Sequence, residues 1–180
     1  MKDEELLVTQ LKNPDTQEQA FRNLMSLYKE RLYWHIRKIV LSHDDTDDVL
    51  QNTFIKVFKN IHSFKQNSKL YSWMYRIATN EAITFINKKA KTKNLDISEL
   101  QYKMADDLQD DHYYSGDEIQ RLLQKAIVTL PQKQQLVFNM KYFDEMKYTD
   151  MSEVLETSVG ALKASYFHAV KKIEQFLKSH

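Results

Sequence analysis

The sequence has no cysteine and, among its 180 residues, only two glycines and two prolines. Without cysteine it has no disulfide framework, no thiolate nucleophile and no cysteine-based zinc site. A β-rich protein needs many tight turns and a glycine-rich phosphate loop needs several glycines, so these counts exclude both. No apolar run reaches the roughly 18 residues of a membrane span, and the N-terminus lacks the apolar core of a signal peptide. We therefore expect a cytoplasmic protein without membrane insertion.

The net charge of +1 conceals an uneven distribution. Residues 1–94 carry a net charge of +5 and residues 119–180 a net charge of +3, whereas residues 95–118 carry −7. This asymmetry predicts two basic domains, 1–94 and 118–180, joined by a flexible acidic linker at 95–117. Four apolar linker residues leave a short helix open as an alternative: Leu95, Ile97, Leu100 and Met104.

Apolar spacing at i, i+3, i+4 and i+7 predicts helices from about residue 17 onward. The expected inward positions include Phe58 in the second helix and Ile119 in the first helix after the linker. Residues 70–89 form the expected third helix, and no segment shows the period-two alternation of a strand. The predicted fold class is all-α, with two small helical domains.

Residues 148–155, a turn at 156–158 and a long helix at 159–177 have the proportions of a helix-turn-helix, with Ser158 as the expected cap of the long helix. Leu162, Ala169 and Ile173 are expected to face inward. The opposite face suits the major groove, because small residues allow close approach and lysines bind phosphates or guanines. An ordinary helical hairpin with a solvated lysine face is the alternative. The candidate DNA-binding residues here are Ser158, Gly160, Lys163, Phe167, His168 and Lys171.

Residues 56–93 contain nine lysines and arginines against one acid, Glu81. Aromatic residues are interleaved with these cations, a pattern typical of single-strand binding. Core aromatics beneath a solvated basic face are the alternative. The candidate strand-binding residues are Lys65, Lys69, Tyr71, Tyr75, Arg76, Asn80, Lys88 and Lys89.

The preceding helix begins with the acidic segment 44–48. Carboxylates at this position suit the positive end of the helix dipole. A docking surface for a basic protein partner is the functional interpretation, with Asp48, Gln51, Asn52 and Phe54 as its candidates.

No catalytic constellation stands out. The six histidines lack metal-ligand spacing, and caps or linker charge explain the paired aspartates. We expect a protein that is not an enzyme and holds no cofactor and no metal.

Three segments in order resemble bacterial RNA polymerase sigma factors. Residues 44–58 are similar to the family's Asp-x-x-Asp-x-x-Gln-x-x-Phe signature, and residues 72–80 are similar to its Trp-Leu-x-x-Ile-Ala-x-Asn segment. Leu130-Pro131, followed by 148–155 and 158–163, resembles the family's C-terminal domain. The length of the chain, and the presence of nothing but a linker between the two domains, resemble the small extracytoplasmic-function group of this family.

The resemblance implies an alternative sigma factor that binds core RNA polymerase and directs promoter-specific initiation. The segment with Asp48, Gln51 and Asn52 would dock on the coiled coil of the polymerase's largest subunit. The loop 62–70 and Asn80 would capture a flipped base of the melted non-template strand at the minus-ten element. Lys88 and Lys89 would lie near the upstream duplex. The implied partners also include duplex DNA at the minus-thirty-five element, read by the last helix, and an anti-sigma factor, which in this family can be membrane-anchored.

The chain departs from the family pattern at several positions. Thr84 stands where the family usually has aspartate, and Glu156 stands where the turn usually has glycine. Ser165, His168 and Val170 replace three arginines of the usual recognition helix, so we expect fewer phosphate contacts and a shallower salt dependence.

Two other functions stay open at this point. A sigma-like decoy that sequesters an anti-sigma factor does not need DNA-binding faces, so the cation excess in 56–93 disfavours it. A conventional helix-turn-helix regulator leaves residues 1–94 unexplained and lacks an obvious dimerisation element.

Overall fold

The computed structural model describes residues 2–110 and 118–179, and within these ranges it contains helices and no strand. The α-helices are α1 (Lys2–Lys12), α2 (Gln17–Val40), α3 (His43–Asn60), α4 (Leu70–Lys93), α5 (Ile97–Asp106), α6 (Glu118–Val128), α7 (Gln132–Tyr142), α8 (Tyr148–Leu155) and α9 (Val159–Lys178). Two short 3-10 helices are η1 (Ile61–Ser63) and η2 (Asp107–Asp110). The all-α prediction is confirmed. In the described part of the chain, every helix is too short or too polar to cross a membrane.

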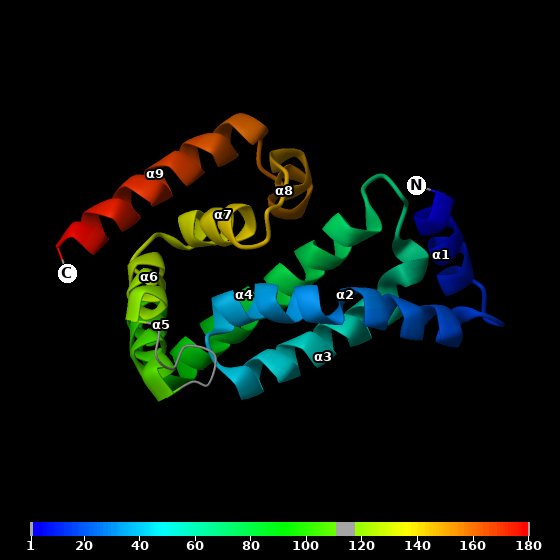
Figure 1. Ribbon diagram of the computed structural model, residues 1–180. Coiled ribbons are helices and arrows are strands. Elements are labelled where there is room, and N and C mark those ends of the chain that lie inside the picture. The colour runs from blue at the N-terminus through cyan, green and yellow to red at the C-terminus, as the bar shows by residue number, and fades with distance from the viewer. Residues whose placement is uncertain (1, 111–117, 180) are drawn as a thin grey trace.

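The long helices α2, α3 and α4 pack on one another as an N-terminal bundle (Figure 1). Helix α1 covers one end of this bundle, where Val8 and Leu11 are buried beside Leu24 and Leu70. Apolar spacing predicted helices only from about residue 17, so α1 was not predicted. The available signal was short, because only Leu7, Val8 and Leu11 form its apolar side.

Serine caps begin two of the helices. Ser42 Oγ accepts a hydrogen bond from the Asp45 amide at 3.4 Å at the start of α3. Ser158 Oγ accepts one from the Ala161 amide at 3.3 Å at the start of α9, which confirms the predicted cap. Each cap satisfies an amide that has no partner within its own helix.

Helix α5 occupies part of the expected flexible linker. Leu100 is buried, and α5 packs against α4 and α6. The side-chain nitrogen Nε2 of Gln101 donates to the Ile39 carbonyl oxygen at 3.3 Å, and Gln101 Oε1 accepts from Gln135 Nε2 at 3.2 Å. Residues 97–106 are therefore an ordered part of the core, because their apolar residues find buried partners. Asp107–Asp110 of the expected linker form η2, and its residues 111–117 lie outside the described residues.

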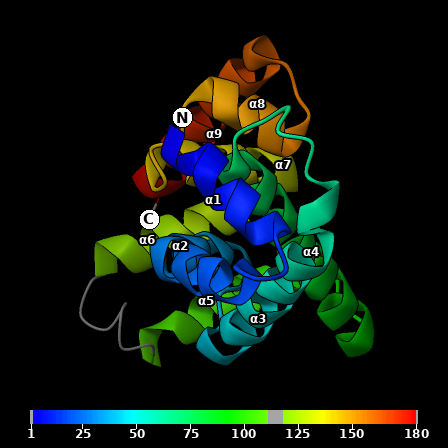
Figure 2. The ribbon, with the colours of Figure 1, turned by 90° about the vertical axis from the view of Figure 1, so that its right-hand side faces the viewer.

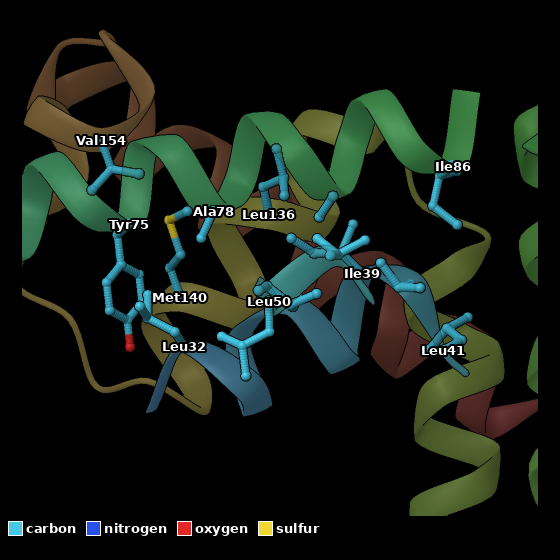
Figure 3. Close-up of a cluster of buried hydrophobic side chains, with 14 of the residues drawn as sticks. Leu32, Ile39, Leu41, Leu50, Tyr75, Ala78, Ile86, Leu136, Met140 and Val154 are labelled. Atoms are coloured by element: carbon cyan, nitrogen blue, oxygen red, sulfur yellow. The ribbon is translucent and has the colours of Figure 1, made fainter. Parts of the chain in front are cut away.

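One apolar cluster continues from the N-terminal bundle into the C-terminal helices α7 and α8. Figure 3 shows Leu32 of α2 and Tyr75 and Ala78 of α4 in this cluster with Met140 of α7 and Val154 of α8. The two halves of the chain thus pack directly on each other. Figure 2 shows α8 beside the loop that leads into α4, with α1 on the other side of that loop.

Two residues expected in the core are exposed. The Phe58 side chain is 41% exposed, because it borders a groove between α2 and α3. Ile119 is 79% exposed, because it lies in the first turn of α6, ahead of the residues that pack on α9.

Glu156 ends α8 in the left-handed conformation, with φ 50° and ψ 43°. In this conformation a residue other than glycine costs the native state about 1 kcal/mol of stability, because its Cβ crowds the backbone. We expect Glu156→Gly to be more stable than Glu156→Ala by about 1 kcal/mol, since both variants lose the same carboxylate. Urea denaturation measures the difference. Equal stability of the two variants would show that this turn is unstrained.

Candidate nucleic-acid interface and docking groove

The cations expected to bind a strand lie on the edge of α4 that faces α8. Lys69, the N-cap of α4, donates to Asp150 Oδ1 at 2.6 Å, and this hydrogen bond raises the pKa of the lysine. Arg76 Nη1 donates to Glu156 Oε1 at 2.7 Å. Asn80 is exposed and lines, with Arg76, a cleft of about 270 Å³ between α4 and the C-terminal helices. Three candidates therefore share one edge, and acidic side chains of α8 and its cap pair with two of them.

Tyr75 does not lie on this surface. Its side chain is 1% exposed, and its ring packs against His35 at 4.7 Å and Tyr71 at 4.4 Å. Burial raises the pKa of its hydroxyl well above the ordinary value. The expectation that Tyr75 stacks on a base is wrong for this arrangement, because its side of α4 turns toward α2. Tyr71 is half-buried, and the Arg31 guanidinium lies 4.7 Å from its ring centre.

The remaining cations of this set are spread along the bundle. Lys65 is exposed in the loop before α4, and Lys88 is exposed near the other end of that helix. Lys89 pairs with Asp45 of α3 and lies over the Phe85 ring. Lys88 and Lys89 are therefore remote from the edge that carries Lys69.

The outward face of α9 is exposed as the sequence predicted. Lys163, Phe167, His168 and Lys171 are exposed, whereas Leu162, Ala169 and Ile173 are buried. The Lys171 ammonium lies 4.5 Å from the Phe167 ring centre, within range of a cation–π interaction.

Two small residues mark the N-terminal end of this face. Ser158 and Gly160 are both exposed there. A Cβ added at Gly160 meets nothing within 4 Å, so packing does not require glycine at this position. The start of α9 is therefore open to close approach by another molecule.

A groove of about 520 Å³ lies between α2 and α3. Phe54 forms its buried wall, and Ile55 is 44% exposed on its surface. Its other apolar residues are Phe21, Met25, Leu50 and Phe58, and its polar rim comprises Lys29, Asp47, Asp48, Gln51 and Lys59. Three of the four predicted docking residues line the groove, while Asn52 is exposed outside it.

The apolar side of this groove was not predicted. Phe21, Met25, Ile55 and Phe58 contribute to it, and the sequence pattern placed all of these except Ile55 in the core. The available signal was an apolar stripe on residues 50–61 too wide for one buried face. Exposed apolar side chains gathered in a groove indicate a binding site for a protein partner.

A buried polar cluster joins the two halves of the chain. Asp144, which follows α7, accepts hydrogen bonds from His35 Nδ1 and Lys38 Nζ of α2, each at 2.9 Å. His35 Nε2 lies 2.8 Å from Thr79 Oγ1, whose single hydrogen is donated to the Tyr75 carbonyl oxygen at 2.7 Å. Two side chains of α2 thus bind one carboxylate that follows α7, and this contact ties the two halves together.

No group of three His, Asp or Glu side chains in residues 2–110 and 118–179 lies close enough together to hold a metal ion.

Family models match both halves of the chain. The model of Sigma-70 region 2 matches residues 24–92, and that of Sigma-70, region 4 matches residues 120–173. Among solved structures, CnrH in complex with the cytosolic domain of CnrY is similar, with a TM-score of 0.71, 18% identity and coverage of 98% of this chain and 97% of that chain. The sigma factor RpoE in complex with the anti-sigma factor NepR from Bartonella quintana has a TM-score of 0.66 and 20% identity, covering 88% and 96% of the two chains.

Curated relatives span nearly the same length. The extracytoplasmic-function (ECF) RNA polymerase sigma factor SigW of Bacillus subtilis (strain 168) is 30% identical over 164 residues, which cover 87% of each chain. The ECF RNA polymerase sigma-E factor of Haemophilus influenzae is 28% identical over 163 residues, which cover 86% of each chain. With both sigma regions matched in order, the chain belongs to the extracytoplasmic-function group of RNA polymerase sigma factors.

Proposed function

We propose that this protein is an alternative sigma factor that binds core RNA polymerase and directs it to a specific set of promoters. The observation that carries this proposal is the presence, on one chain, of an apolar docking groove in the region 2 half and an exposed helix-turn-helix face in the region 4 half. The protein acts in the cytoplasm by binding and positioning, and catalysis belongs to the polymerase.

The groove between α2 and α3 is the proposed polymerase site. Its floor is apolar and its rim carries charges of both signs, so it suits an amphipathic helix. The family resemblance implies that this partner is the coiled coil of the polymerase's largest subunit.

Three surfaces divide the proposed promoter contacts. Lys69, Arg76 and Asn80 on α4, with Lys65 and Tyr71 nearby, serve the melted strand of the minus-ten element. Lys88 and Lys89 serve the adjoining duplex. The α9 face reads the minus-thirty-five duplex, with lysines for phosphates and Phe167 for an apolar base contact.

An anti-sigma factor is the proposed regulatory partner. The structurally similar sigma factor RpoE was solved bound to the anti-sigma factor NepR. A decoy function is the alternative, and it differs in one property, because a decoy has no affinity for core polymerase.

Run-off transcription with cognate core polymerase tests the proposal. We expect discrete transcripts from genomic fragments only when this protein is added, with start sites mapped by sequencing. An identical transcript pattern with and without the protein, on every fragment tried, would exclude a sigma function.

Lys163→Ala is expected to weaken binding to duplex promoter DNA. Loss of one phosphate or base contact lowers affinity by roughly tenfold, and loss of a phosphate contact lowers the slope of log affinity against log salt by about 1. Lys172→Ala is the matched control, because Lys172 is also exposed on α9 but lies on the opposite side of the helix. Fluorescence anisotropy across a salt series measures both quantities. If the two variants bind alike, the α9 face is misassigned.

A further inference from the structure

Acidic residues follow one side of α8 and its C-terminal cap: Asp150, Glu153 and Glu156. Two of them form ion pairs with cations of α4: Asp150 pairs with Lys69, and Glu156 pairs with Arg76. The pairs occur in the same order along both helices. About 10 Å of helix separates the two cations and about 9 Å separates the two acids, so both pairs form at once.

The third acid faces the loop that leads into α4. A hollow of about 450 Å³ lies beside this loop, with Asn67 and Ser68 on one side and carboxylates on the other. Glu153 comes from α8, and Glu4 and Glu5 come from α1. A DNA phosphate entering the hollow would meet like charges from both helices.

Apolar packing holds α8 in this position. Val154 is buried against α4 in the cluster that also contains Tyr75 and Ala78 (Figure 3). Exposed ion pairs contribute little stability one by one. The packing therefore sets the place of α8, and its carboxylates then neutralise the cations opposite.

The two proposed DNA-binding surfaces, on α4 and on α9, thus differ in whether their cations are already paired with carboxylates. The cations on α4 already have carboxylate partners, whereas Lys163, Phe167 and His168 on α9 are exposed. A strand phosphate that binds Lys69 or Arg76 must displace the α8 carboxylate that is paired with that cation.

We propose that α8 is an internal competitor for single-stranded promoter DNA: its carboxylates occupy Lys69 and Arg76, the cations that would otherwise bind the phosphates of the melted minus-ten strand. This inference rests on the proposed function. In the free protein these two cations are neutralised while the duplex-reading face of α9 stays open, and separation of α8 from α4 frees them.

The double variant Asp150→Asn/Glu156→Gln removes both carboxylates and keeps the side-chain size. Glu118→Gln/Glu174→Gln is the matched control, because it removes two exposed acids of the same half that lie on α6 and α9. We expect the first variant to bind a short fluorescein-labelled single-stranded DNA roughly five- to tenfold more tightly than the control. Both variants should bind duplex DNA equally, since α9 is unchanged.

Energy transfer measures the opening itself. The chain lacks cysteine, so Gln19→Cys and Lys178→Cys place two dyes on exposed sites of α2 and α9. We expect single-stranded DNA to lower the transfer efficiency of the wild-type background as α8 leaves α4. Unchanged transfer on binding, or equal single-strand affinity of the double variant and its control, would overturn the competitor proposal.

Run-off transcription separates this failure from failure of the proposed function. If the wild-type protein supports transcription but the single-strand results are negative, the chain is a sigma factor without an α8 competitor. If the double variant gains single-strand affinity but neither protein supports transcription, the competitor stands and the sigma function fails.

Discussion

Asp144→Ala is expected to open the contact between the two halves of the protein. Removing one partner of a buried ion pair costs about 3–5 kcal/mol, because the remaining charges stay buried without compensation. Asp144 is 6% exposed, and its loss leaves His35 and Lys38, at 1% and 10%, with no carboxylate between them. Separation of the halves lets water solvate the Lys38 ammonium and the His35 ring, so we expect opening at lower urea concentration than unfolding.

Trp34 reports this opening, because it lines a hollow together with Phe143 and Asp144. In a Trp73→Phe background, its emission should shift to the red in Asp144→Ala before the helical circular dichroism is lost. Glu145→Ala is the control, as the adjacent residue is acidic and exposed. If Asp144→Ala and Glu145→Ala follow the same urea curve, the Asp144 cluster does not hold the halves together.

The same contact predicts that the stability of the native state depends on pH in the acid range. Burial raises the pKa of the Asp144 carboxyl, but hydrogen bonds and charge from His35 and Lys38 outweigh burial and hold it below the ordinary value of 3.8. A carboxyl with a lowered native pKa stabilises the native state fully above its unfolded value, and this stabilisation is lost as the pH falls through the native value. The stability difference between wild type and Asp144→Asn should therefore be constant near neutrality and shrink below about pH 4.

Ile55→Glu is expected to have the largest effect on polymerase binding. Ile55 lies in the groove between α2 and α3, and a carboxylate there would be buried against the partner's apolar side chains. Substitutions at the centre of an interface cost 2 kcal/mol or more, and an unpaired buried charge adds to this, so we expect a loss of about 100-fold or more. Because Ile55 is 44% exposed in the free protein, its stability should change by about 1 kcal/mol or less.

Ile119→Glu is a matched control for this change. It makes the same substitution at an isoleucine that is 79% exposed and lies outside the groove. Titration of labelled protein with core polymerase gives both dissociation constants, and thermal unfolding gives both stabilities. The groove is not the polymerase site if the two variants bind core polymerase with equal affinity.

Local signals in the sequence identified most of the helices and much of the candidate site. The cap at Ser158, the turn at 156–158 and the outward face of α9 depend on neighbours within a few residues, so spacing and residue type predicted them. Helix α1 escaped notice because its apolar side is short. Part of the expected linker proved to be α5, because Leu100 and its neighbours found a buried surface that no local signal describes.

The sequence by itself determined an all-α chain with a basic, aromatic-rich helix and a helix-turn-helix, because helical periodicity, caps and turns act over short distances. Tertiary structure alone decided that Tyr75 is buried, that Phe58 borders a groove and that α8 covers the cations of α4. Lys69 and Asp150 are 81 positions apart in the chain, so their pairing depends on how the two halves pack. Which charged residues are open to a ligand is therefore a property of the packed arrangement, because burial and pairing arise only when distant segments meet.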